Sequence, residues 1–191
     1  MAPKQNSDFF KNNIIILRDY HPYWIIPKVY KNPKIDDITY KIMDLKEETS
    51  HNHSKSVTFF TTVLSLELTN YIFNLDEIIA AIVPSHEKGK LSTGLRAIVR
   101  NLKQNYNIIN EKNPLVRHTT IAKLSSGGDR SKEVHLGSIC VDVNIDLKGR
   151  VVLLIDDVTT SGNSLIACTD LLYQAGASCV INIALAKTNH E

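Results

Sequence analysis

Two adjacent carboxylates, Asp156 and Asp157, directly follow the apolar run VVLLI and precede the small-residue segment VTTSGNS. Carboxylates at the end of a buried strand accept hydrogen bonds from a diol and from the water shell of Mg²⁺. A small-residue loop that opens a helix presents backbone N–H groups and the positive end of the helix dipole, which together bind phosphate. Gly162 lets the backbone approach a ligand closely. Further hydroxyl donors are Thr160, Ser161 and Ser164. The segment therefore predicts a site for a phosphorylated sugar.

The elements that must position this segment alternate between apolar strands and amphipathic helices. Strands are expected at 78–83, 116–122, 138–141, 151–155 and 179–186, and helices at 54–72, 91–104 and 164–174. This alternation is typical of a parallel sheet with helices on both faces. We therefore expect an α/β fold with a twisted, mainly parallel sheet.

The N-terminal part of the chain has a different pattern. Short apolar runs at 14–17 and 24–26 are bounded by Pro22, Pro27 and Pro33, which favours strands or turns outside the main sheet. We expect residues 1–39 to form a hood or flap and residues 40–191 to form the α/β domain.

Composition limits the classes of function. The net charge of +2 in 191 residues is too small for a broad nucleic-acid or membrane surface. The cysteines at 140, 168 and 179 lack metal-ligand spacing and are expected to be reduced thiols. No apolar stretch approaches the length of a membrane span. We therefore expect a cytoplasmic location and no membrane partner.

The 156–164 segment resembles the phosphoribosyl pyrophosphate (PRPP) motif of type I phosphoribosyltransferases, and its form is closest to the ComF-type competence proteins. Residues 82–86 with 94–96 resemble the family's pyrophosphate-loop strand and helix. Residues 117–120, followed by Arg130, resemble its middle segment. The resemblance covers roughly residues 40–187 and implies the type I phosphoribosyltransferase fold.

The resemblance implies a role for each matched residue. Asp156 and Asp157 would be the catalytic pair, holding the ribose hydroxyls and, through water, the cofactor Mg²⁺. The PRPP 5′-phosphate would be bound by Thr159, Thr160, Ser161, Gly162, Asn163 and Ser164. The pyrophosphate would be bound by Ser85, His86, Lys88, Arg117 and Arg130. The Gly- and Ser-rich segment 125–132, with Arg130 and Lys132, is expected to act as a lid over the site.

Two departures from the family pattern narrow these expectations. No cysteine precedes Cys140, so the zinc ribbon that often begins ComF-type proteins is absent from this sequence. In the branch that salvages 6-oxopurines, an aspartate that acts as base follows the paired acids by three positions, and here that position is Thr160. A 6-oxopurine acceptor is therefore disfavoured.

Three functions stay open at this stage. The first is a glycosyltransferase of nucleotide metabolism that transfers a phosphoribosyl group to or from a nucleobase-like acceptor. The second is a non-catalytic sensor that binds PRPP or a nucleotide and regulates a partner. The third is a component of a DNA-uptake or defence assembly, with Arg96, Arg100 and Lys103 on one helix touching DNA phosphates. A homodimer or a protein partner is compatible with each.

Overall fold

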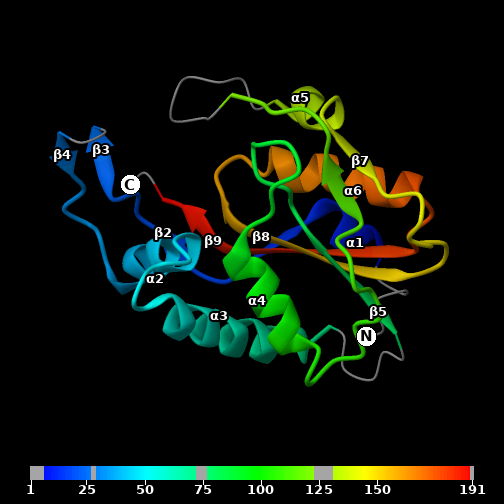
Figure 1. Ribbon diagram of the computed structural model, residues 1–191, viewed down its shortest axis with the longest axis horizontal. Helices are drawn as coiled ribbons and strands as arrows, with labels where there is room; N and C mark the ends of the chain where they lie inside the picture. The colour runs from blue at the N-terminus through cyan, green and yellow to red at the C-terminus, as the bar shows by residue number, and fades with distance from the viewer. Residues whose placement is uncertain (1–6, 27–28, 72–76, 123–130, 190–191) are drawn as a thin grey trace.

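The computed structural model describes residues 7–26, 29–71, 77–122 and 131–189. Its centre is a five-stranded sheet in the order β1-β9-β8-β5, with β2 also paired to β9, and every pairing in it is parallel (Figure 1). The strands are β1 (Ile14–Ile16), β2 (Asp19–Tyr20), β5 (Ile78–Ile82), β8 (Val151–Thr159) and β9 (Cys179–Thr188). The predicted α/β fold with a mainly parallel sheet is confirmed.

Helices cover both faces of this sheet. The helices α2 (Asp37–Lys46), α3 (His53–Leu68) and α4 (Thr93–Leu102) lie on one face, and α6 (Asn163–Gln174) lies on the other (Figure 1). The short helix α1 (Ser7–Asn12) contacts β9. The helix α5 (Lys132–Leu136) packs against α6, next to a small antiparallel sheet of β6 (Leu115–Arg117) and β7 (Ile139–Val141).

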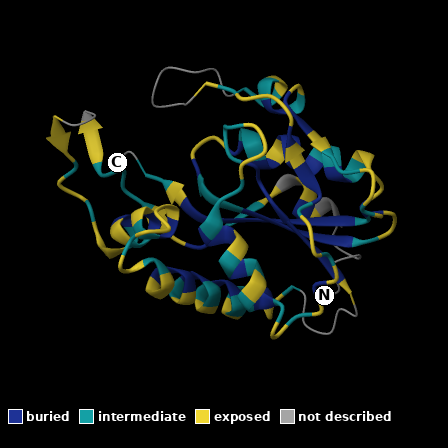
Figure 2. Cartoon of the chain, viewed as in Figure 1, coloured by how far each residue is buried: buried dark blue, intermediate teal, exposed yellow. Residues whose placement is uncertain are grey.

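Alternate side chains of each strand supply two separate cores. Leu153 and Ile155 of β8 pack with α2, α3 and α4, whereas Val152 and Leu154 pack with α6. Because both faces are covered, β5 is apolar and buried at every position, and β8 is apolar and buried from Val151 to Ile155 (Figure 2). The strands at 78–83, 151–155 and 179–186, and the helices at 54–72, 91–104 and 164–174, are confirmed in position, with ends that differ by a few residues.

The outer edge of β5 is closed by two asparagine side chains. Asn110 accepts a hydrogen bond from the Ala80 N–H at 2.8 Å and donates one to the Ala80 carbonyl at 2.8 Å. Asn113 does the same for Ile82, at 2.7 and 3.0 Å. These amides occupy the groups with which another strand would pair, so the sheet ends here. The β5 edge is thereby fixed just before the chain turns into the pocket at Pro84.

The N-terminal part departs from expectation in one respect. Residues 14–16 were expected outside the main sheet, but β1 pairs in parallel with β9, with Ile14 opposite Asn182. Three residues are too few for periodicity to show whether a strand joins the central sheet. The apolar run at 24–26 does lie outside the central sheet, because β3 (Trp24–Ile26) pairs only with β4 (Tyr30–Lys31) among the described strands. The division of the chain into 1–39 and 40–191 stays a prediction.

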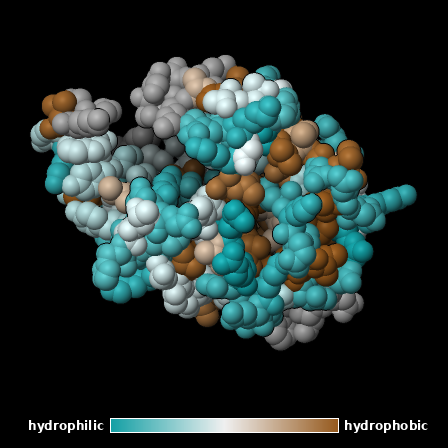
Figure 3. Space-filling model, viewed as in Figure 1, coloured by the Kyte–Doolittle hydropathy of each residue, from teal (hydrophilic) through white to brown (hydrophobic). Residues whose placement is uncertain are grey.

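The β3–β4 hairpin carries exposed apolar side chains at its tip, including Ile25 and Val29, which are 56% and 74% exposed (Figure 3). At its base the Tyr23 ring packs edge-on against Trp24 and Tyr40, with centroid distances of 5.0 and 6.1 Å. These aromatic side chains therefore contact one another.

Several other elements differ from the sequence-based expectation. The strand expected at 116–122 is shorter, and it lies in the small antiparallel sheet. The helices α1, α2 and α5 were not expected. Cys168 and Cys179 are buried and Cys140 is exposed, and all three are free thiols. None of the helices in the described ranges is long and apolar enough to cross a bilayer.

Candidate phosphate and sugar site

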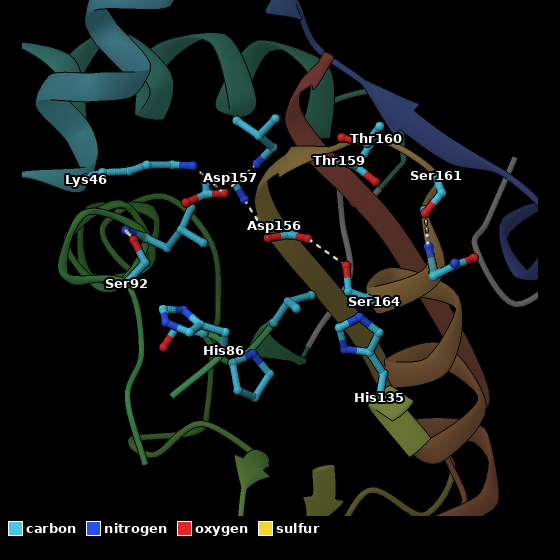
Figure 4. Close-up of a pocket in the computed structure, with 17 residues that line it drawn as sticks. Lys46, His86, Ser92, His135, Asp156, Asp157, Thr159, Thr160, Ser161 and Ser164 are labelled. Carbon is cyan, nitrogen blue, oxygen red and sulfur yellow. Dashed lines mark hydrogen bonds and ion pairs between the residues drawn. The ribbon is translucent and has the colours of Figure 1, made fainter. Parts of the chain in front are cut away.

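A cavity of about 770 Å³ opens where β5 and β8 end and α6 begins (Figure 4). In parallel sheets, the crevice beyond the carboxyl ends of the strands is the usual ligand site. Its lining residues are Lys46, Val83, Pro84, Ser85, His86, Ser92, Leu95, His135 and the continuous segment 156–164. Asp156, Asp157 and all six residues expected to bind the 5′-phosphate therefore share one cavity with Ser85 and His86.

The two carboxylates are held by different partners. Asp156 Oδ1 accepts a hydrogen bond from the Asp157 N–H at 2.9 Å, and Oδ2 accepts one from the Ser164 hydroxyl at 3.1 Å. Asp157 Oδ1 accepts the Val158 N–H at 2.6 Å and lies 3.4 Å from the Lys46 ammonium. Asp156 is thus tied to the start of α6 and Asp157 to the end of α2.

The position of Asp156 changes its acidity. Burial, and after it the negative charge of Asp157, raise the pKa of Asp156 to about 7. Three other groups lower the pKa of Asp156 but offset only part of this rise: the Asp157 N–H, Lys46 and Ser164. Near neutral pH this carboxyl group is therefore divided between its protonated and ionised forms, and a bound cation would favour the ionised form.

The loop between β8 and α6, residues 159–164, forms a cup that is a candidate site for an anion. Gly162 adopts φ +83° at the N-cap of α6, a left-handed conformation that L side chains rarely adopt. The buried Thr159 hydroxyl has no hydrogen-bond partner within the described structure. Buried polar groups are nearly always paired, so an unpaired hydroxyl beside a helix N-terminus indicates a ligand. Thr160 differs, because its hydroxyl is 2.9 Å from that of Thr188.

His86 lies across the cavity from the 156–164 segment (Figure 4), and the preceding residue Ser85 also lines the cavity. The Ser85 N–H donates to the Lys90 carbonyl at 3.1 Å, and the Ser85 hydroxyl accepts the Glu87 N–H at 3.4 Å. His86 Nε2 lies 3.5 Å from a Glu87 carboxylate oxygen. The turn after β5 is therefore closed on itself and holds both side chains against the cavity.

Arg117 was expected to contact the pyrophosphate, but the structure places it behind the pocket wall. Its side chain is 1% exposed, and it donates hydrogen bonds to the Ser85 carbonyl at 2.5 Å and to the Ser138 hydroxyl at 2.5 Å. A further guanidinium nitrogen is 3.2 Å from His135 Nδ1. A buried guanidinium is stabilised by such acceptors, and here it fixes the Ser85 peptide and the His135 ring.

The remaining predicted residues are not brought to the cavity. Lys88 is exposed, and its N–H donates to the Thr120 hydroxyl at 3.0 Å, outside the lining. Arg130 and most of the expected lid lie outside the described residues. Lys132 pairs with Asp170 at 2.5 Å and so links α5 to α6.

Sequence reasoning missed three polar residues of the lining, Lys46, Ser92 and His135. A signal for the helix that carries Lys46 was present, because Asp36 and Thr39 form a capping box at its start. Nothing in the sequence pairs Lys46 with an acid more than 100 residues later.

The acid pair has the donor chemistry of a magnesium site that keeps its waters, since Mg²⁺ is bound by one or two carboxylates and ligand phosphates. Within the described part of the chain, no group of three or more His, Cys, Asp or Glu side chains could hold a metal ion directly. Asp156 and Asp157 therefore fit Mg²⁺ bound together with a phosphorylated ligand.

These features define an α/β protein with a phosphate cup and a carboxylate pair at the end of a parallel sheet. The phosphoribosyl transferase domain family matches residues 96–191, which contain both the carboxylates and the cup. The chain belongs to this family. Ser85 and His86 lie before the matched region.

Solved structures similar to the chain include two phosphoribosyltransferases. A hypoxanthine-guanine phosphoribosyltransferase from Bacillus anthracis is 14% identical, with 69% of this chain and 65% of that chain covered and a TM-score of 0.42. A purine phosphoribosyltransferase from Pyrococcus horikoshii is 17% identical, with 70% and 83% covered and a TM-score of 0.43. This chain thus spans less than two thirds of the Bacillus protein. No curated protein matches the chain.

Proposed function

We propose that the cavity binds phosphoribosyl pyrophosphate with Mg²⁺, and that the chain transfers the phosphoribosyl group to or from a nucleobase-like acceptor. The observation that carries the proposal is that one cavity holds both a pair of carboxylates and a small-residue loop at a helix N-terminus. Asp156 reaches the Ser164 hydroxyl, and the cup contains the buried, unpaired Thr159 hydroxyl. A ribose 5-phosphate is a ligand that uses both features at once.

Each part of the cavity then has a task. The cup takes the 5′-phosphate through the amides at the start of α6 and the Thr159 hydroxyl. Asp156 and Asp157 accept hydrogen bonds from the ribose hydroxyls, and their negative charge favours an oxocarbenium-like transition state. Ser85 and His86 face the leaving pyrophosphate across the cavity. Mg²⁺, when bound, would supply charge that stabilises the departing pyrophosphate.

The acceptor that we propose is a nucleobase-like molecule other than a 6-oxopurine. Position 160 carries a hydroxyl that is engaged with Thr188 and no acid, so the base used for a 6-oxopurine is missing there. We place the chain nearest to the ComF-type proteins within its family, and we assign choice of the acceptor to the N-terminal hood. The β3–β4 hairpin lies within this hood.

The test is an assay with labelled phosphoribosyl pyrophosphate, Mg²⁺ and a panel of nucleobases and amines, following pyrophosphate release. We expect turnover with at least one acceptor, and loss of ligand binding in the double variant Asp156→Asn, Asp157→Asn. The matched control is Asp146→Asn, an exposed turn carboxylate that only accepts the Lys148 N–H. A double variant that binds the ligand as tightly as the unmodified protein would contradict the proposed site.

A second candidate function is a non-catalytic sensor of phosphoribosyl pyrophosphate or a nucleotide. The absence of an acid at position 160 favours it, because the cup needs no general base to bind a ligand. The same assay separates the two functions, since a sensor shows saturable binding without pyrophosphate release. The DNA-binding alternative keeps only part of its basic face, because Lys103 is paired with Glu111 at 2.9 Å.

A further inference from the structure

Lys46 reaches the acid pair from a distant part of the chain. It lies in the last turn of α2, and its ammonium is 3.4 Å from Asp157 Oδ1, pointing across the cavity mouth (Figure 4). The Lys46 side chain is 48% exposed and that of Asp157 is 20% exposed. The ammonium thus contacts a carboxylate of the proposed ligand site, while the Lys46 side chain as a whole is about half exposed.

The backbone beneath Lys46 is fixed by packing. Ile42 and Leu45 of α2 are fully buried in the core that α3 and α4 share. Gly94 of α4 lies against Leu45 so closely that a Cβ there would be 2.4 Å from the Leu45 carbonyl oxygen. The start of α2 is fixed by the capping box of Asp36 and Thr39. The helix therefore presents Lys46 to the cavity at a set position, while its four-carbon side chain can still move.

We propose that Lys46 is a resident counter-ion: it neutralises Asp157 in the ligand-free cavity, competes there with a divalent cation, and turns to phosphate oxygens when phosphoribosyl pyrophosphate and Mg²⁺ enter. This inference rests on the function proposed above. A lysine suits the task because its ammonium is a compact charge with three rotatable donors. Partly exposed ion pairs are weak, so the pair with Asp157 can exchange one partner for another.

The proposal predicts effects of opposite sign on two ligands. Lys46→Gln removes a positive charge that competes with a divalent cation at Asp157, so the cation alone should bind about tenfold more tightly, equivalent to about 1.4 kcal/mol. The same change removes a positive charge that faces the ligand's phosphates, so phosphoribosyl pyrophosphate with Mg²⁺ should bind roughly tenfold more weakly. A lysine that only supported the fold would not strengthen binding of any ligand.

The experiment measures binding of Mn²⁺ alone by electron paramagnetic resonance, and of phosphoribosyl pyrophosphate with Mg²⁺ by calorimetry, on the whole chain. Lys41→Gln is the matched control, because Lys41 lies on the same helix and pairs with Asp37 instead of the acid pair. Melting temperatures report whether each variant folds. We expect tighter Mn²⁺ binding and weaker phosphoribosyl pyrophosphate binding for Lys46→Gln, with neither change for Lys41→Gln.

The outcomes separate this inference from the function on which it rests. If the unmodified protein binds phosphoribosyl pyrophosphate but Lys46→Gln binds Mn²⁺ no more tightly, Lys46 is not a competing counter-ion and the proposed function stands. A Lys46→Gln variant that loses affinity for both ligands also overturns the inference. If the unmodified protein binds no phosphoribosyl pyrophosphate, the proposed function fails and the inference fails with it.

Discussion

Replacing Asp156 by asparagine should stabilise the ligand-free protein at neutral and alkaline pH. The pKa of Asp156 rises from 3.8 to about 7 in the folded chain, chiefly through burial and then through the charge of Asp157. Between these two values the folded state holds a proton that the unfolded state has released. The free energy of unfolding therefore falls as pH rises from about 4 to about 7, and asparagine, which does not ionise, removes this loss.

The size of the effect follows from that shift. A change of roughly 3 pKa units, at 1.36 kcal/mol for each unit, sets an upper limit of about 4 kcal/mol. The carboxylate borders an open cavity where water screens its charge, so we expect about 2 kcal/mol. For a chain of this length that gain corresponds to a melting temperature higher by roughly 4–8 °C. Asparagine can keep both contacts, since its oxygen can accept the Asp157 N–H and its amide can donate to the Ser164 hydroxyl.

The assay is thermal unfolding of both proteins from pH 4 to pH 8 in EDTA, so that no divalent cation binds. The two melting curves should coincide near pH 4 and separate as the pH rises, with the asparagine variant the more stable. The pH 4 comparison is an internal control for any change in packing. A variant that is less stable at pH 8, or whose difference is the same at every pH, would refute the reasoning about Asp156.

Three further predictions concern the loop and its support. Thr159→Val should leave the melting temperature within a few degrees, because it removes an unpaired hydroxyl, and should weaken phosphate binding about tenfold by calorimetry. Gly162→Ala should destabilise the chain by about 1–2 kcal/mol in urea unfolding. The φ of residue 162 is +83°, and the Cβ of an alanine there would be 2.8 Å from Ile14 Cδ1. An unchanged urea midpoint would show that the loop relaxes freely. Arg117→Met should lower the free energy of unfolding by about 3 kcal/mol in urea unfolding, because it leaves the Ser85 carbonyl and the Ser138 hydroxyl without their donor. Near-native stability would mean that these contacts matter little.

The central strands, and the position of the loop between β8 and α6, were predictable because their signals are local. The run VVLLI is apolar at every position, as a strand covered on both faces requires, and the loop with its helix follows in the next few residues. The three-residue strand β1 gave no comparable signal, since its pairing depends on the free edge of β9 far along the chain. The strands that the sequence predicted correctly are therefore those with long, continuous apolar runs.

The walls of the cavity were less predictable, because contacts between distant segments decide them. Arg117 ends the short strand β6 and resembles a surface residue in the sequence, yet in the structure it is buried against the carbonyl of Ser85 and the ring of His135. Lys46 lies in an ordinary amphipathic helix, and the packing of α2 against α3 and α4 brings it to Asp157. Sequence patterns identify the residues of a loop but not the partners that the fold brings to them.

The most direct test is a crystal structure of the chain with phosphoribosyl pyrophosphate and Mn²⁺, with anomalous data to locate the metal. The account predicts the 5′-phosphate in the 159–164 loop within hydrogen-bond distance of the Thr159 hydroxyl, and the ribose hydroxyls on Asp156 and Asp157. A ligand bound elsewhere, with the loop empty and Asp157 still paired with Lys46, would contradict it.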